Sequence, residues 1–226
     1  MNYPFLILHG WGSCAQRWEE VKNYLESKGF KVYVPDLPGF GQSPPPKKVW
    51  SISDYAEWVK EYCKEQNLLK VFLLGHSFGG AIALKFSLKY PEKVKKLFLV
   101  APAIIRKRSL KKEIIKKIAK PFSFLPESAK KIIYIKILKS NYPLKKGIMR
   151  DIFLRVIKED QLEDCSSISV PTVIIWGEND NITPLKDAYS IYKRMKKSKL
   201  VIIEDQGHDL NRNAPELLVN MVLENI

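Results

Sequence analysis

The sequence predicts an α/β domain in which a mainly parallel sheet carries helices on both faces and one helical insertion. Short apolar runs typical of buried strands alternate along most of the chain with segments of helical period. This alternation stops between residues 103 and 165, where helical spacing continues without an intervening strand. We therefore expect a core built from residues 1–102 and 166–226, with residues 103–165 as a basic helical segment inserted into it.

The individual elements follow from apolar periodicity, turn residues and helix caps. The expected strands are 4–8, 31–34, 71–74, 96–100, 170–176 and 199–203. The expected helices are 15–28, one that begins at Ser51 or Ser53 and ends near 66, one from 81 to about 90, 184–196 and one from 214. Within the insertion, Ile148, Ile152 and Val156 recur at helical spacing, and three prolines divide it into about three helices.

The positive charge of the chain is concentrated in the insertion. The 226 residues have a formal net charge of +14, and residues 106–158 alone contain 17 lysines and arginines against three acidic residues. Such a run is most often a solvated face. The alternative is that it attracts an acidic carrier protein, an anionic surface or an anionic substrate. Nucleic acid is not expected, because no nucleic-acid-binding module accompanies the charge.

Cysteine usage and apolar run lengths indicate a cytosolic protein with no transmembrane segment. Cys14, Cys63 and Cys165 are odd in number and show no C-x-x-C spacing, which argues against a disulfide framework and a zinc site. No apolar run near the N-terminus approaches the roughly 20 residues of a membrane helix, and no signal sequence precedes the first strand. We expect neither a metal ion nor a cofactor.

The sequence G-x-S-x-G at residues 75–79 predicts a nucleophile. It lies between the apolar run Val71 to Leu74 and the helix-forming segment that begins at Ala81. In such a strand-to-helix turn, Gly75 and Gly79 let neighbouring backbone pass close, so the Ser77 hydroxyl is held exposed. A serine hydroxyl is a weak nucleophile near neutral pH, so the turn also requires a base and donors for the oxyanion.

The base is selected from only three histidines. His76 adjoins the nucleophile, and adjacent side chains in a turn are expected to point apart. His9 belongs to the loop after the first strand, where a structural imidazole is the favoured interpretation. His208 remains, and it follows the last expected strand. We expect it to take the proton of Ser77 and later to protonate the leaving group.

An acid that orients the histidine is expected after the fifth strand. Asp180 follows that strand and gives the chain order serine, acid, histidine, so it is preferred over its competitors. Those competitors are Glu178, Asp205 and Asp209. All four loops that carry the site follow strands, and the carboxyl ends of parallel strands share one edge of a sheet, where ligands bind.

The remaining requirement is a pair of oxyanion donors. The loop His9-Gly10-Trp11-Gly12 directly follows the first strand, and its glycines allow a tight turn with backbone N–H groups facing a cleft. The natural donors are the backbone amides of Trp11 and Phe78. Asp36, in the loop after the second strand, is interpreted as an anchor rather than an acid catalyst.

Five motifs in order resemble the α/β-hydrolase fold over essentially the whole chain. They are H-G-W-G at His9, D-L-P-G-F-G-x-S at Asp36, G-H-S-F-G-G at Gly75, G-E-N-D at Gly177 and G-H-D at Gly207. The resemblance implies the triad Ser77, Asp180 and His208 and a lid at residues 103–165. Because the chain begins almost on the oxyanion-loop strand, without the family's two preceding strands, it also implies a sheet of about six strands.

The resemblance narrows the function to hydrolysis. The first two motifs are similar to carboxylesterases, a group that includes pimeloyl-carrier-protein methyl ester esterases. We expect a serine carboxylesterase acting on small to medium acyl esters. The alternatives are a thioesterase or acyl-carrier-protein ester hydrolase that docks an acidic partner on the lid, a C–C bond hydrolase, and a hydrolase-fold binding or receptor protein. Ser77 argues against epoxide hydrolases and haloalkane dehalogenases, which carry aspartate at that position.

Overall fold

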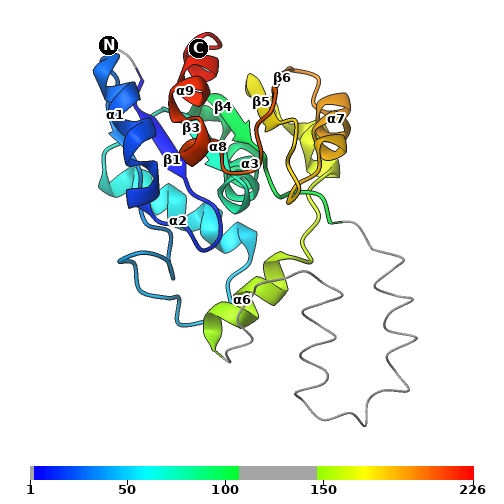
Figure 1. Cartoon of the computed structure of the whole chain (residues 1–226). Coiled ribbons are helices and arrows are strands. Elements are labelled where there is room, and N and C mark those ends of the chain that lie inside the picture. The colour runs from blue at the N-terminus through cyan, green and yellow to red at the C-terminus, as the bar shows by residue number, and fades with distance from the viewer. Residues whose placement is uncertain (1–2, 107–146) are drawn as a thin grey trace, which may run out of the picture.

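A computed structural model describes residues 3–106 and 147–226, and there it forms a single six-stranded parallel sheet (Figure 1). The strand order is β2-β1-β3-β4-β5-β6. The strands are β1 Phe5–Leu8, β2 Val32–Tyr33, β3 Val71–His76, β4 Val94–Val100, β5 Thr172–Gly177 and β6 Ser198–Ile203. Every pairing between neighbours is parallel, which confirms the predicted parallel sheet and its expected strand number.

The register brings the loops that follow the strands to one edge. Leu8, the last residue of β1, pairs with Gly75 of β3, and Gly177 of β5 pairs with Ile203 of β6. In the middle of the sheet, His76 pairs with Val100. The segments that leave β1, β3, β5 and β6 therefore start at the same edge, as the sequence predicted for the site.

Alternating side chains of the strands form a separate core on each face of the sheet. Phe5 and Ile7 point to one face, and Leu6 and Leu8 to the other. The first face packs against 3₁₀-helix Ala15–Trp18 and helices α1 Glu19–Ser27, α8 Leu210–Asn213 and α9 Pro215–Leu223. The second packs against α2 Ile52–Glu65, α3 Phe78–Lys89, α6 Ile148–Val156 and α7 Leu185–Arg194. This confirms helices on both faces, and α1 lies beside α9 (Figure 1).

Helix α2 shows how a local signal sets an element's start. Ser51 is its N-cap, and its hydroxyl accepts a hydrogen bond from the Asp54 N–H while the Asp54 carboxylate accepts one from the Ser51 N–H. This reciprocal capping box satisfies two backbone donors that the helix leaves unpaired. The sequence allowed the helix to begin at Ser51 or Ser53, and the capping box shows that Ser51 is the N-cap.

Several element boundaries differ from the prediction, and two of these differences lie next to Ser77 and His208. The helix expected from residue 81 begins at Phe78, because the turn at Ser77 leads directly into it. The closing helix is preceded by the short helix α8, since Asp209 starts a helical turn that its polar sequence did not suggest. Neither difference moves the edge of the sheet where the site lies.

The described end of the insertion packs on the core. Ile152 and Val156 of α6 are buried in the same core as Leu6 and Phe78. This confirms the helical spacing noted around Ile148, Ile152 and Val156. Residues 107–146, which include the three prolines and most of the basic residues, lie outside the described part. Within the described part, no helix combines the length and the apolar character that a membrane span needs.

Candidate active site

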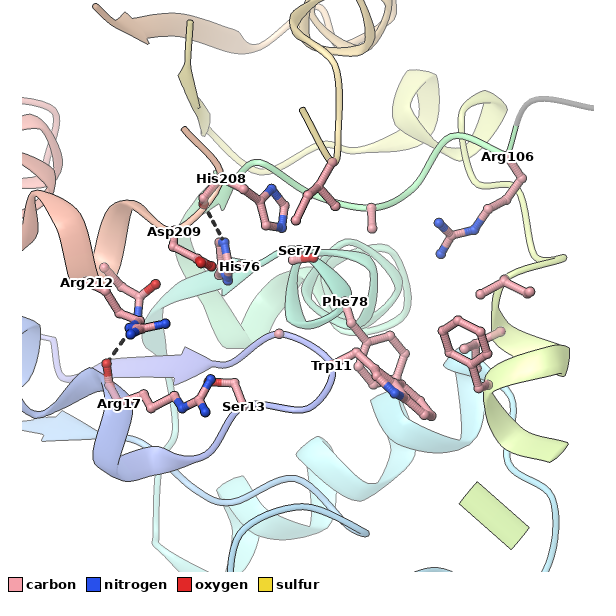
Figure 2. A pocket seen from close by; sticks show the side chains of 17 residues that line it. Trp11, Ser13, Arg17, His76, Ser77, Phe78, Arg106, His208, Asp209 and Arg212 are labelled. Atoms are coloured by element: carbon pink, nitrogen blue, oxygen red, sulfur yellow. Dashed lines mark hydrogen bonds between the residues drawn. The ribbon is translucent and has the colours of Figure 1, made fainter. Parts of the chain in front are cut away.

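Ser77 occupies a strained turn between β3 and α3. Its backbone has φ 53° and ψ −114°, a region that residues with a side chain rarely adopt. The turn is held by the Ser77 N–H, which donates to Val100 O at 3.0 Å, and by the Ser77 carbonyl, which accepts from the Ala103 N–H at 2.9 Å. The strain is thus offset by bonds to Val100, at the end of β4, and to Ala103, in the segment that follows it, and the hydroxyl projects into a pocket (Figure 2).

The flanking glycines are required by close backbone contacts. A Cβ on Gly75 would lie 2.6 Å from the Cβ of Ala83 and also overlap the carbonyl oxygen of Gly79. A Cβ on Gly79 would overlap the main-chain oxygens of Leu8 and His9. Helix α3 can therefore start directly against β1 only because these positions have no side chain. The sequence prediction of a tight strand-to-helix turn is confirmed.

His9 and Asp36 fix the loops around Ser77. The Nδ1–H of His9 donates to Gly10 O at 2.9 Å, and its Nε2 accepts from the Leu37 N–H at 3.0 Å. Burial lowers the pKa of His9, so the ring is neutral with both nitrogens engaged. The Asp36 carboxylate accepts from the N–H groups of Ala15 and Gln42. Both residues are structural anchors, as expected from the sequence.

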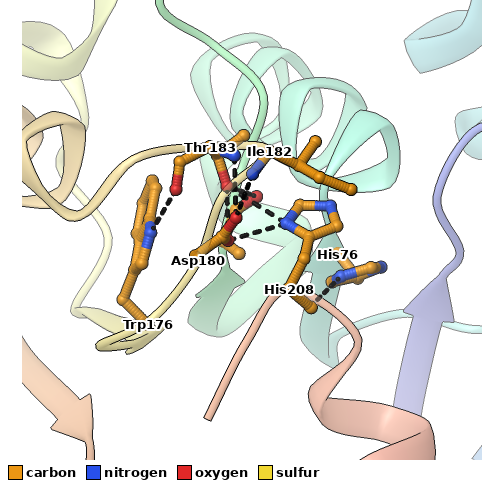
Figure 3. Close-up of polar contacts among 7 residues, drawn as sticks. His76, Trp176, Asp180, Ile182, Thr183 and His208 are labelled. Atoms are coloured by element: carbon orange, nitrogen blue, oxygen red, sulfur yellow. Dashed lines mark hydrogen bonds and ion pairs between the residues drawn. The ribbon is translucent and has the colours of Figure 1, made fainter. Parts of the chain in front are cut away.

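Asp180 and His208 are joined by a short hydrogen bond. The Nδ1 of His208 lies 2.7 Å from Asp180 Oδ2, and the Asp180 side chain is fully buried (Figure 3). Burial raises the pKa of Asp180, but hydrogen bonds from His208, Thr183 and Ile182 outweigh it and hold that pKa below its usual range. The carboxylate is therefore ionised at neutral pH and places the proton of His208 on Nδ1, leaving the lone pair of a neutral imidazole on Nε2.

The competing acids do not take this position. Among the described residues, no hydrogen bond joins His208 to Glu178, Asp205 or Asp209. Glu178 accepts from the Asp205 N–H at 3.4 Å, and Asp209 lies in the pocket lining. The structure thus pairs His208 with Asp180, the histidine and the acid that were predicted to act together.

Thr183 is a supporting residue that the sequence analysis missed. Its hydroxyl donates to Asp180 Oδ2 at 2.7 Å and lies 3.2 Å from His208 Nδ1. Its own N–H and that of Ile182 donate to Asp180 Oδ1, each at 2.8 Å, and its carbonyl accepts from Trp176 Nε1 (Figure 3). The available signal was the D-N-I-T sequence, in which a threonine three residues after an aspartate can close a side-chain-to-backbone turn.

His76 contacts His208, an interaction that the sequence analysis did not predict. Its Nε2–H donates to the carbonyl oxygen of His208 at 3.0 Å, and the two rings have centroids 4.8 Å apart. The prediction that the side chains of His76 and Ser77 point apart did not reveal this contact with the loop after β6. Through this bond, His76 helps to hold the main chain of His208 in place.

The burial of His76 is expected to make the free energy of unfolding depend on pH. Burial, followed by the charge of His208, lowers its pKa from 6.5 to about 4, against the opposing effects of the His208 carbonyl, Asp209 and Asp180. The unfolded chain thus binds a proton that the folded chain excludes between these values, so stability is lost as the pH falls below 6.5. At pH 4.5 this loss is roughly 2 to 3 kcal/mol.

Urea unfolding of the wild type and His76→Gln at pH 7 and pH 4.5 measures this contribution. The other acidic and histidine groups titrate in both proteins, so the difference between the two pH-induced losses isolates His76. We expect the variant to lose less stability than the wild type on acidification. Equal losses in the two proteins would contradict the proposed burial of a neutral His76.

The residues of the site line one pocket of about 310 Å³ (Figure 2). Ser77 and His208 face it together with the Trp11 loop and the first residue of α3, Phe78. The Phe78 amide is the first of α3, so it has no acceptor within the helix. Gly10 lets this loop approach, because a Cβ there would lie 3.2 Å from His76 Nδ1 and 3.4 Å from Ser77 Cβ. The pocket thus brings together Ser77, His208, the Trp11 loop and Phe78, all of which were predicted from the sequence. Asp180, the predicted acid, is buried and does not line the pocket.

This arrangement agrees with a family match over more than half of the chain. Residues 3–134 match the model of the alpha/beta hydrolase fold, and residues 155–222 match a model described as TAP-like protein. The chain belongs to the α/β hydrolase fold family. It is therefore a hydrolase by family, in agreement with the resemblance seen in its motifs.

Relatives of this α/β hydrolase include esterases and lipases. It is 32% identical to a pimeloyl-[acyl-carrier protein] methyl ester esterase of Wigglesworthia glossinidia brevipalpis, over 96% of this chain and 91% of the relative. It is 26% identical to a putative esterase/lipase 2 of Mycoplasma genitalium, over 97% and 87%. A solved esterase from Exiguobacterium antarcticum shares the fold with a TM-score of 0.76 at 22% identity, covering 99% of this chain and 91% of the other.

Proposed function

We propose that this α/β hydrolase is a serine carboxylesterase that cleaves small to medium acyl esters through an acyl-enzyme on Ser77. The observation that carries the proposal is the 2.7 Å bond from buried Asp180 to Nδ1 of His208, a residue that lines the same pocket as Ser77. The bond leaves His208 Nε2 as the basic atom. The strained turn supplies the hydroxyl that such a base would activate.

The proposed reaction has two halves with the same groups. As Ser77 Oγ attacks the ester carbonyl carbon, its proton passes to His208 Nε2, and the amides of Trp11 and Phe78 donate to the oxyanion. The imidazolium, balanced by Asp180, then gives that proton to the departing alkoxide, which leaves as the alcohol. Water attacks the acyl-enzyme after losing a proton to His208, and the acid is released as Ser77 regains its proton.

The pocket supports the substrate size. A volume of about 310 Å³ is at the lower end of the range usual for small-molecule sites. Its wall includes Trp11, Phe78 and Phe153, and the rings of Trp11 and Phe153 have centroids 5.2 Å apart. This aromatic part of the wall suits the hydrocarbon portion of an acyl chain. Small and medium acyl esters therefore fit better than long-chain lipids.

We also propose the division into a core, residues 1–102 and 166–226, and a lid, residues 103–165. The part of the lid that the structure describes contributes five residues to the pocket lining: Ala103, Arg106, Phe153, Val156 and Ile157. A segment that walls a pocket over a nucleophile can exclude water and shape substrate choice. The lid would thus determine specificity while the core supplies the reacting groups.

A second candidate is the hydrolysis of a thioester or of an ester held by an acidic carrier protein. The charge of residues 106–158, 17 basic against three acidic, favours it by attracting such a partner. The relative of Wigglesworthia glossinidia brevipalpis, described as an acyl-carrier-protein methyl ester esterase, points the same way. The same triad would perform each reaction: a thioester differs from a simple ester in its leaving thiol, and a carrier-bound ester differs in the group attached to its acyl part.

Hydrolysis of p-nitrophenyl butyrate by the wild type and Ser77→Ala tests the proposal. We expect kcat/KM to fall by at least about 10⁴-fold in the variant, because the nucleophile is removed while the pocket remains. Butyryl coenzyme A in parallel separates the ester from the thioester candidate. Activity on neither substrate above that of Ser77→Ala would reject both candidates and favour a binding protein.

A further inference from the structure

Arg106 enters the pocket from the segment that leaves β4. Its N–H donates to Asp160 Oδ2 at 2.6 Å, which fixes the backbone where the proposed lid begins. Its side chain lines the same pocket as Ser77 and His208, and the guanidinium points toward the interior (Figure 2). A cation is thus held facing the proposed reaction centre.

The guanidinium lacks a partner for a buried donor. Within residues 3–106 and 147–226, Arg106 Nε is buried and makes no hydrogen bond. Burial lowers the pKa of Arg106, against the charges of Asp160 and Glu159, but a guanidinium stays protonated in proteins. A buried charged donor without an acceptor is unfavourable. A bound ligand would supply the missing acceptor.

The two neighbouring carboxylates are engaged elsewhere. Asp160 accepts from the backbone of Arg106 itself and from the Leu162 N–H at 2.9 Å. Glu159 accepts from the Ile52 N–H and lies 3.8 Å from Arg155. Neither acid therefore neutralises the guanidinium through a direct side-chain bond.

The rest of the pocket is positive as well. Two further arginines line the pocket: Arg17, from the 3₁₀-helix before α1, and Arg212, from α8. Both are far from Arg106 in the sequence. Among the described lining residues, the only carboxylate is that of Asp209. Three guanidinium groups against one carboxylate would raise the local concentration of an anionic substrate.

We propose that Arg106 binds a carboxylate group of the substrate, so that the preferred substrates are esters carrying a second, free carboxylate. This inference rests on the proposed esterase function and narrows its substrate class. A guanidinium matches a carboxylate because its planar fork can donate two parallel hydrogen bonds. The free carboxylate can belong to the acyl part, as in a dicarboxylic acid monoester, or to the alcohol part, as in the ester of a hydroxy acid.

Two substrate pairs of equal length test this. Monoethyl adipate is compared with ethyl hexanoate for an anion on the acyl side, and 4-acetoxybutanoate with butyl acetate for one on the alcohol side. The readout is the ratio of kcat/KM for the anionic member to that for the neutral member. In at least one pair we expect Arg106→Met to lower this ratio about 10- to 100-fold, the effect of losing hydrogen bonds to a charged group.

Two further variants locate the effect. Arg106→Lys keeps the charge but loses the fork, so it should retain part of the preference. Arg194→Met removes an arginine of α7 that pairs with Glu163 outside the pocket, and it should leave both ratios at the wild-type value. If Arg106→Met leaves both ratios unchanged, or if Arg194→Met lowers them equally, the inference is wrong.

A binding measurement separates this inference from the proposed function. Calorimetric titration of Ser77→Ala with monoethyl adipate or 4-acetoxybutanoate detects the carboxylate site without turnover. We expect binding of at least one of them that weakens about 10-fold or more when Arg106→Met is added. Binding of this kind without any ester hydrolysis by the wild type would uphold the carboxylate site and reject the esterase. Hydrolysis of neutral esters without Arg106-dependent binding would uphold the esterase and reject the carboxylate site.

Discussion

His208→Ala is expected to lower kcat/KM for p-nitrophenyl butyrate about 10⁴-fold. The physical reason is that His208 is the group proposed to move the proton in both halves of the reaction, and alanine leaves Ser77 as an unactivated hydroxyl. The pocket and the oxyanion amides of Trp11 and Phe78 remain, so the residual rate should still exceed that of water. Initial rates at neutral pH, with circular dichroism to verify folding, measure the effect.

Asp180→Asn with its matched control Asp205→Asn extends this prediction to the acid. Asparagine removes the charge that fixes the His208 tautomer, so Asp180→Asn should lose activity on the same scale. Asp205 is an exposed carboxylate near the end of β6, and Asp205→Asn should keep the wild-type rate. A loss below 10-fold in His208→Ala, or equal losses in the two aspartate variants, would contradict the assignment.

Gly79→Ala is expected to lower the free energy of unfolding by at least about 3 kcal/mol. An added Cβ would overlap the main-chain oxygens of Leu8 and His9, and backbone cannot rotate away as a side chain can. Helix α3 would have to move off β1, and the oxyanion loop would move with it. Urea unfolding followed by circular dichroism gives the free energy, and the amount of soluble protein gives an independent readout.

Gly207→Ala is the matched control for this prediction. A Cβ at Gly207 would have no heavy atom within 4 Å, so the same change of residue adds a methyl group into open space. We expect its free energy of unfolding to lie within about 1 kcal/mol of the wild type. If Gly79→Ala is as stable as Gly207→Ala, the close approach of α3 to β1 does not hold the nucleophile turn in place.

The features that the sequence predicts well are those encoded by neighbouring residues. The G-x-S-x-G turn is local, since the positions of Gly75, Ser77 and Gly79 fix a strand, a strained turn and a helix within a few residues. The order of the strands then brings Asp180 and His208 to the same edge, because parallel strands align their carboxyl ends. Local motifs and topology together were sufficient to select the histidine and its acid.

The features that the sequence could not give depend on contacts between distant segments. His76 bonds the main chain of a residue 132 positions away, and no periodicity reports such a contact. Arg106 is one of many basic residues in its segment, and only its placement in the pocket distinguishes it from a solvated charge. Thr183 required knowing that the Asp180 loop folds back on its own carboxylate.

Labelling with a fluorophosphonate, followed by peptide mass spectrometry, tests most directly whether Ser77 is a nucleophile activated by His208. An activated serine oxygen displaces the fluoride of the reagent and forms a stable bond to phosphorus, whereas unactivated serines react far more slowly. We predict one adduct, on the peptide that contains Ser77, and a labelling rate that falls at least about 100-fold in His208→Ala. An adduct on a different residue, or labelling of Ser77 at an unchanged rate in His208→Ala, would contradict the mechanism.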